Sequence, residues 1–214
     1  MSAINFKPWV GKDYFTKGYQ GQRILVLGES HHCDENLCSS GRCYPMCQKE
    51  KLQDDCFSFT EDVIRHFVYK YNRERPLQTF LCFERAVVGK ELSLQEREDF
   101  WNNVMFYNYV QYAQSTARKE PMPEQWEMSK NAFAELLNEY KPDKIIVWGV
   151  RLFDSLSYLG GEVKTLTVSE NDTVDVRLIP VNGKLIPTMK MIHPSTPKGK
   201  KWNYWHQAIS KFLE

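Results

Sequence analysis

Four short apolar runs along the chain have the pattern of strands that are buried on both faces. Arg23 to Gly28 (RILVLG) and Lys144 to Gly149 (KIIVWG) each end in glycine, and Val104 to Val110 (VMFYNYV) is interrupted by one Asn. Thr188 to Ile192 is the fourth run, and it leads directly into His193-Pro194-Ser195-Thr196. Continuous apolar runs of this length are typical of parallel strands covered by helices, whereas half-exposed strands alternate.

Between these runs, apolar residues recur at helical spacing. The pattern predicts helices over Phe59–Tyr71, Leu94–Asn102, Pro123–Tyr140, Val150–Leu159 and Trp202–Leu213. Ser93, with Glu96 three residues later, predicts a capping box before the second of these helices. Pro142 predicts the end of the third, because proline disfavours helical geometry in the residue before it. Residues 163–187 alternate and contain Asn182-Gly183, so we expect hairpin strands there.

Strands that alternate with helices predict an α/β fold, with three α/β/α layers around a central, mainly parallel four-stranded sheet. We expect residues 1–214 to form a single domain, with residues 1–22 as a leader packed on it. A Cys-rich loop, residues 33–56, is inserted after the first strand. Ligands of such folds bind at the carboxyl ends of the strands, so the polar residues there should converge on one crevice. These residues are Glu29, Ser30, His31, His32, Asn108, His193 and Ser195.

The first candidate motif is Gly28-Glu29-Ser30-His31-His32. Glycine after a buried strand lets the backbone turn and approach a ligand. Glu29 could act as a general base, and His31 or His32 could donate or accept a proton near neutral pH. The alternative is that Glu29 caps a following helix and both histidines are exposed to solvent.

Two further candidates lie at the later strand ends. In His193-Pro194-Ser195-Thr196, proline fixes a turn that aims its neighbours, and Ser195 could cap a helix or bind phosphate; the alternative is a tight turn with an incidental histidine. Asn108 is polar within an apolar strand. A buried amide must be hydrogen-bonded, and its paired donor and acceptor can read the edge of a base. The alternative is a structural Asn bonded to the backbone.

The cysteines are concentrated in one loop, where Cys33, Cys38, Cys43 and Cys47 have the spacing C-x4-C-x4-C-x3-C. Zinc or an iron–sulfur cluster would fix the shape of so long a loop. The spacing lacks the C-x2-C pairs of common zinc folds, so a set of reduced thiols is the alternative. No apolar run approaches the ~20 residues of a membrane span, and the start of the chain lacks the apolar core of a secretory signal. We therefore expect a cytoplasmic protein without a membrane partner.

The charges nearly cancel, with 28 Lys and Arg against 27 Asp and Glu. This balance excludes a protein that coats nucleic acid by bulk charge, but it allows a local basic patch. No acid lies between Val176 and Leu213, and Lys198, Lys200 and Lys201 directly follow the His193 turn. Cations with interleaved aromatics suit a single strand or a flipped nucleotide. The alternative is a solvated loop beside a helix whose aromatics (Trp202, Tyr204 and Trp205) face the core.

In their order along the chain, these pieces resemble the uracil-DNA glycosylase superfamily. Gly28-Glu29-Ser30-His31-His32 stands at the family's water-activating motif, and Cys56-Phe57-Ser58 resembles the segment whose aromatic stacks on the base. Asn108 stands at the base-reading position, Val147-Trp148-Gly149 at the third strand end, and His193-Pro194-Ser195 at the last motif. The resemblance spans residues 23–213. It departs from the classical pattern where Ser30 replaces an Asp and His31 replaces a Pro, whereas other branches place a Glu second, as here.

The resemblance implies an enzyme that flips a nucleotide out of DNA and hydrolyses its glycosidic bond. Asn108 would then pair with the base, Phe57 would stack on it, and His193 would stabilise the departing base. Glu29, or a water held by Ser30 and His31, would position the attacking water, and Gly28 and Ser195 would contact the substrate. No cofactor is required for this catalysis, and the protein would act as a monomer on damaged or single-stranded DNA. Two alternatives remain: a nucleic-acid or nucleotide-binding member of the fold without catalysis, and an unrelated hydrolase that uses Glu29 and His31 on a small molecule.

Overall fold

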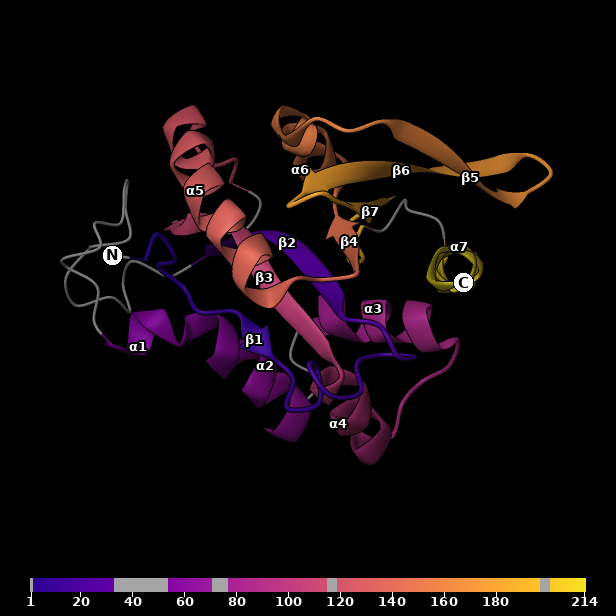
Figure 1. Cartoon of the computed structure of the whole chain (residues 1–214). Helices are drawn as coiled ribbons and strands as arrows, with labels where there is room; N and C mark the ends of the chain where they lie inside the picture. Colours follow the sequence, from indigo (N-terminus) through magenta and orange to yellow (C-terminus); the bar gives the residue numbers. More distant parts are fainter. Residues whose placement is uncertain (1, 33–53, 71–76, 115–118, 197–200) are drawn as a thin grey trace.

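The computed structural model describes residues 2–32, 54–70, 77–114, 119–196 and 201–214. Within these residues, a seven-stranded mixed sheet forms the centre of the fold (Figure 1). Its strands are β1 (Trp9–Val10), β2 (Ile24–His32), β3 (Val104–Gln114), β4 (Lys144–Trp148), β5 (Val163–Ser169), β6 (Asp172–Val181) and β7 (Lys184–Met191). Their order across the sheet is β1-β3-β2-β4-β7-β6-β5.

The centre of this sheet is parallel and its two edges are antiparallel. β2 pairs in parallel with β3 and β4, and β4 pairs in parallel with β7. β1 is antiparallel to β3, and the β5–β6 hairpin continues the sheet beyond β7. The prediction of a mainly parallel four-stranded sheet is therefore wrong for the sheet as a whole. The sequence pattern places the short β1 in the leader and does not assign the hairpin strands to this sheet.

The link between the hairpin and the parallel strands is a tight turn. β6 ends at Val181 and β7 begins at Lys184, so the last parallel strand starts four residues earlier than Thr188. Asn182 and Gly183 between them have φ of +49° and +77°. Positive φ at both central residues is the geometry that Asn-Gly favours in a two-residue hairpin, which confirms the hairpin signal and explains why the fourth strand is longer than predicted.

Helices cover both faces of the sheet, because the strand side chains alternate between two apolar clusters. On one face, Ile24, Val26 and Phe106 pack with residues of α2 (Phe59–Lys70), α3 (Gln78–Val88), α4 (Leu94–Asn102) and α7 (Trp202–Leu213). On the other face, Leu25 and Leu27 pack with α5 (Pro123–Tyr140) and α6 (Val150–Ser155). Figure 1 shows α5 and α6 on one side of the sheet and α2, α3 and α4 on the other. Within the described residues, no helix is both long and apolar enough to cross a membrane.

The helices predicted at 94–102, 123–140 and 202–213 are confirmed with the same bounds. The capping box is present, since the Ser93 side chain accepts from the Glu96 N–H and the Glu96 carboxylate accepts from the Ser93 N–H. The helix predicted at 150–159 is divided into α6 and a 3-10 turn at Leu156–Leu159. α3 was not predicted, although its buried residues Phe80, Phe83, Ala86 and Val87 recur at helical spacing.

The amino-terminal segment packs on this body over its described length. Phe6 and Tyr14 are buried, and Trp9 of β1 donates its indole N–H to the Trp101 carbonyl at 2.8 Å. Before β1, Lys7 donates its backbone N–H at 2.8 Å to the carbonyl of Phe57 in the short helix α1 (Asp54–Phe57). The segment therefore runs from one end of β3 toward the element that carries Phe57.

Candidate functional site at the carboxyl ends of the strands

Gly28 and Asn108 lie side by side on neighbouring parallel strands. They are register partners in β2 and β3, and an added Cβ at Gly28 would lie 2.3 Å from the Asn108 Oδ1. Any larger residue at position 28 would therefore displace this amide. Within the described part of the chain, the Asn108 side chain makes no hydrogen bond, so its donor and acceptor are available to a ligand. The alternative of an Asn tied to the backbone through its side chain has no support here.

The His193 side chain is held by the turn that follows β7. The Thr196 N–H donates to the His193 carbonyl at 2.9 Å, which closes the predicted turn with Pro194 at its second position. The Ser195 hydroxyl lies 2.9 Å from His193 Nδ1, and the Ser195 N–H is directed at the same atom at 3.4 Å. An N–H can only donate, so we assign Nδ1 as the acceptor and place the ring proton on Nε2. The turn thus leaves Nε2–H as the donor for a ligand.

Two aromatic rings connect Asn108 with His193. Phe106, two residues before Asn108, lies 5.1 Å from Trp148, and Trp148 lies 6.1 Å from His193 edge-on (centroid distances). The Phe106 ring also reaches to 3.1 Å of the Cβ that Gly28 lacks. Gly28, Asn108 and His193 therefore lie along one aromatic floor at the level where β4 and β7 end, whereas β2 and β3 continue beyond it to His32 and Gln114. This is the convergence that the strand pattern predicts, and it includes residues from both ends of the chain.

Glu29 extends toward the α6 side of the sheet. Its carboxylate accepts from Arg151 Nε at 2.9 Å and from Nη2 of the same guanidinium, and Arg151 also contacts Glu120 at 3.1 Å. The Glu29 side chain is 19% exposed. Burial lowers the pKa of His193, and the negative charge of Glu29 raises it in opposition, so the two groups are near enough to interact. Glu29 lies within β2, so the alternative that it caps a following helix is wrong.

His31 does not face the aromatic floor, because it packs inside the protein. It is 5% exposed, and its ring lies 4.4 Å from Phe6 and 5.1 Å from Phe59. Its Nε2 lies 2.6 Å from the Thr60 hydroxyl, whereas the buried Nδ1 has no hydrogen-bond partner among the residues that the structure describes. Burial lowers the pKa of His31 to about 3, and the neighbouring His32 adds to this effect. This buried position gives no support to the expected substrate contact through His31. Of the two histidines, only His32 is exposed.

The other predicted residues are placed as follows. Ser30 is half-buried in β2 opposite Val110 of β3, and Ser195 is exposed on the turn beside His193. Phe57 is half-buried at the end of α1, and no described contact links its ring to Asn108. Its role as the residue that stacks on a base stays a prediction.

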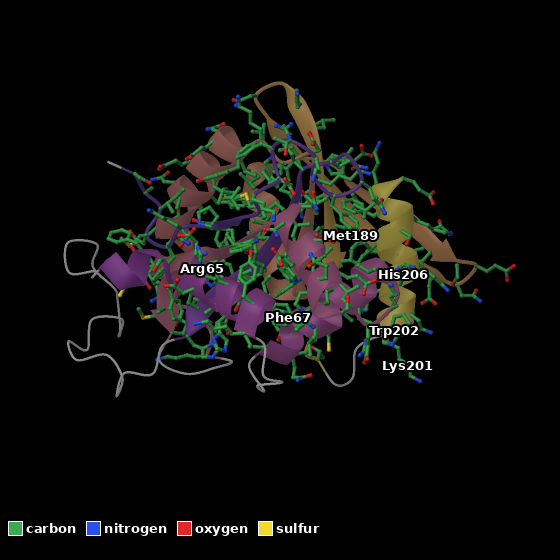
Figure 2. The ribbon with its side chains drawn as sticks, turned by 90° about the horizontal axis from the view of Figure 1, so that it is seen from below. Arg65, Phe67, Met189, Lys201, Trp202 and His206 are labelled. Carbon is green, nitrogen blue, oxygen red and sulfur yellow. The ribbon has the colours of Figure 1, made fainter. Side chains whose placement is uncertain are left out.

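The basic patch is described only at its last residue. Lys201 is exposed immediately before α7, and Trp202, which follows it, is 40% exposed (Figure 2). Trp205 on the same helix is 6% exposed and packs in the core, as the alternative for the aromatics predicts. Lys198 and Lys200 lie outside the described residues, and so do Cys33, Cys38, Cys43 and Cys47. Among the described residues, no group of three or more His, Cys, Asp or Glu side chains is arranged to hold a metal ion.

Two residues near this site were missed by sequence reasoning. Arg151 was hidden because it lies in the helix after β4, and only the fold brings it to Glu29. Gln111 is 1% exposed and hydrogen-bonds the backbone of Asn108. A polar residue three positions after Asn108 in an apolar strand was the available signal.

Two surface hollows lie at the opposite, amino ends of the strands. One of about 250 Å³ is lined by residues that include Asn103, directly before β3. The other, of about 150 Å³, includes Arg23 and Asp143, which directly precede β2 and β4. Neither hollow contains a predicted site residue, and we favour the carboxyl ends because the polar side chains gather there.

No known protein-family model matches the chain, and no curated protein has a significantly similar sequence.

Proposed function

We propose that the protein is a DNA glycosylase-like hydrolase that cleaves the N-glycosidic bond of a flipped uracil or another damaged base. The observation that carries this proposal is the packing of the Asn108 amide against the bare backbone of Gly28, on one aromatic floor with a histidine oriented by Ser195. A base-reading amide and a neutral donor at one sheet end are the two groups that this reaction needs.

The chemistry assigns one task to each group. Asn108 would pair with the edge of the flipped base and Phe57 would stack on its face. The bond from the sugar C1′ to the base nitrogen breaks, and its electron pair leaves with the base. His193 Nε2–H would donate to the base oxygen on which this charge develops, and one such donor is typically worth ~3–4 kcal/mol. Water positioned by the Glu29 carboxylate would attack C1′ and pass its proton to that carboxylate.

Ser30 limits the expected activity. The resemblance places an Asp at this position, and a second carboxylate would stabilise the positive charge on the sugar. Without it, we expect weak excision of uracil or a preference for another base. We further propose damaged or single-stranded DNA as the partner, a monomeric protein, a cytoplasmic location, and no cofactor in catalysis, with Lys198, Lys200 and Lys201 contacting phosphates. A structural zinc or iron–sulfur group on the four loop cysteines is tested by metal analysis and thiol titration of the full chain.

The second candidate function is a nucleic-acid or nucleotide-binding protein of the same fold without catalysis. The Glu29–Arg151 pair favours it, because both oxygens of this carboxylate already accept a hydrogen bond from the guanidinium and are less free to orient a water. It predicts salt-dependent binding that weakens in Lys201→Ala, and no base release. The small-molecule hydrolase that uses Glu29 with His31 has the least support, since His31 is buried against Phe6.

The deciding experiment is base excision from oligonucleotides that contain uracil, hypoxanthine or mismatched bases, in single and double strands. The proposal expects abasic sites from the wild type and their loss in His193→Ala and Asn108→Ala. Asn131→Ala, at an exposed position of α5, is the matched control and should keep the wild-type rate. A wild type that releases none of these bases would refute the glycosylase function, and salt-sensitive DNA binding by that inactive protein would favour the second candidate.

A further inference from the structure

The strand that carries Asn108 is irregular beyond Val110, two residues after it. Gly28 pairs with Asn108 and Ser30 with Val110, but His32 pairs with Gln114. β3 therefore has two more residues than β2 between these pairs. Such bulges interrupt the ladder of backbone hydrogen bonds and are common next to active sites. Other groups must hold the backbone of β3 in place here.

Gln111 supplies these groups from within the bulge. Its side-chain Nε2 donates to the Asn108 carbonyl at 2.8 Å, and its backbone N–H donates to the Ser129 hydroxyl of α5 at 3.0 Å. Gln111 is 1% exposed. If either bond were lost, a buried polar group would be left unsatisfied. The conformation of the chain from Asn108 to Gln111 is thus fixed by one side chain.

The amino-terminal segment holds that side chain in turn. The backbone N–H groups of Asn5 and Phe6 both donate to Gln111 Oε1 at 2.9 Å, and Asn5 Nδ2 donates to the Gln111 carbonyl at 3.1 Å. Both lone-pair positions of Oε1 are used, so the orientation of the amide is determined and Nε2 points to Asn108. The same segment contacts two other predicted site elements, because Phe6 packs on His31 and Lys7 bonds to the Phe57 carbonyl.

We propose that Gln111 is a positioning residue for base recognition and that residues 2–8 form a strap that sets its orientation. This inference rests on the proposed function, since Asn108 is taken to read the base. The strap fixes the backbone of Asn108 through Gln111 and the backbone of Phe57 through Lys7. The two residues proposed to contact the base are therefore held by one segment that contributes no group to the reaction.

Gln111→Glu tests the bond from residue 111 to the Asn108 carbonyl while it keeps the bonds to the strap. A glutamate keeps an oxygen that accepts from the Asn5 and Phe6 N–H groups, but it puts a second oxygen, not a donor, against the Asn108 carbonyl. Asn5→Ala is the milder second variant, because it removes only the Nδ2 bond to the Gln111 carbonyl. Trp9→Phe is the matched control: it loses the bond to the Trp101 carbonyl in the same leader but does not touch Gln111.

The experiment measures single-turnover excision of the base that the wild type removes fastest, inhibition by that free base, and thermal unfolding. Gln111→Glu should lose excision by at least about tenfold and free-base inhibition by a similar factor, relative to Trp9→Phe; Asn5→Ala should lose about threefold in both. Gln111→Glu and Asn5→Ala proteins that match Trp9→Phe would overturn the positioning role, as would excision lost without weaker inhibition. An inactive wild type would overturn the proposed function, and this role with it.

Discussion

The Oδ1 atom of Asn108 lies only 2.3 Å from the point where an added Cβ at Gly28 would be placed. Real Cβ atoms do not approach an oxygen so closely, so the amide orientation depends on glycine at position 28. The backbone of Gly28 is extended in β2, without a positive φ, and the requirement for glycine is one of space. The two residues behave as one unit although 80 positions separate them in the chain.

Gly28→Ala is therefore expected to abolish base excision by rotating the Asn108 amide. The added methyl group must displace this side chain or the Phe106 ring, 3.1 Å away, and overpacking of this kind costs about 1–3 kcal/mol. Urea unfolding and an excision assay on the same preparation measure the two effects.

The double variant Gly28→Ala/Asn108→Ala is the control. Removing the amide removes the overlap, so part of the lost unfolding free energy should return while excision stays absent. Strict additivity of the two single changes in stability would contradict the contact.

This pair also shows what sequence reasoning could reach. Gly28 and Asn108 were singled out because each follows or interrupts an apolar run, and strand ends of a parallel sheet meet at one edge. The bulge in β3, the strap and Arg151 could not be predicted, because each depends on side chains that only the fold brings together. The burial of His31 could not be predicted for a related reason. A histidine three residues after the apolar run has the pattern of a site residue, but β2 extends to His32 and position 31 points inward.

The sheet, like the site, could be predicted from the sequence only in part. Continuous apolar runs identified the four parallel strands, since both their faces are covered. The edge strands β1 and β5 were not placed in the sheet, because β1 is two residues long and β5 is mostly exposed. Pairing partners of such short or half-exposed strands are set by tertiary contacts and not by their own pattern.

His193→Ala is expected to lower the excision rate about 10²–10³-fold, as the loss of one donor to a developing charge does. His193→Gln should recover part of it, since its amide also donates. Ser195→Ala should cost less, about threefold to tenfold, because the Ser195 N–H still faces Nδ1. Single-turnover rates at saturating enzyme measure these differences.

Ser157→Ala, at an exposed serine of the 3-10 turn, is the control for the Ser195 change. A Ser195→Ala protein with the wild-type rate would contradict the assigned tautomer and its orientation by the turn.

Glu29→Gln and Arg151→Gln should distinguish a catalytic role of the Glu29 carboxylate from a role of the Glu29–Arg151 ion pair. If Glu29 accepts the proton of the attacking water, Glu29→Gln loses about 10²-fold in rate. Arg151→Gln keeps the carboxylate and should lose less than tenfold. The pair is partly exposed, with side-chain exposures of 19% and 44%, so each change should alter the unfolding free energy by less than ~1 kcal/mol. Equal rate losses in the two variants would show that the pair, and not the base, is required.

His31 should make the folded protein sensitive to acid. Its pKa is about 3 in the folded protein, because burial disfavours the charged ring, against an ordinary value of 6.5. The unfolded chain therefore takes up a proton first as the pH falls. The contribution of His31 to stability is complete above about pH 6.5 and is lost toward pH 3, at ~1.4 kcal/mol per pH unit. Urea unfolding at a series of pH values should show this slope in the wild type and a shallower one in His31→Gln. Phe59→Leu, which loosens the packing on the same ring without removing a titratable group, should shift the curve downward in parallel. A slope that His31→Gln leaves unchanged would contradict the burial of this histidine.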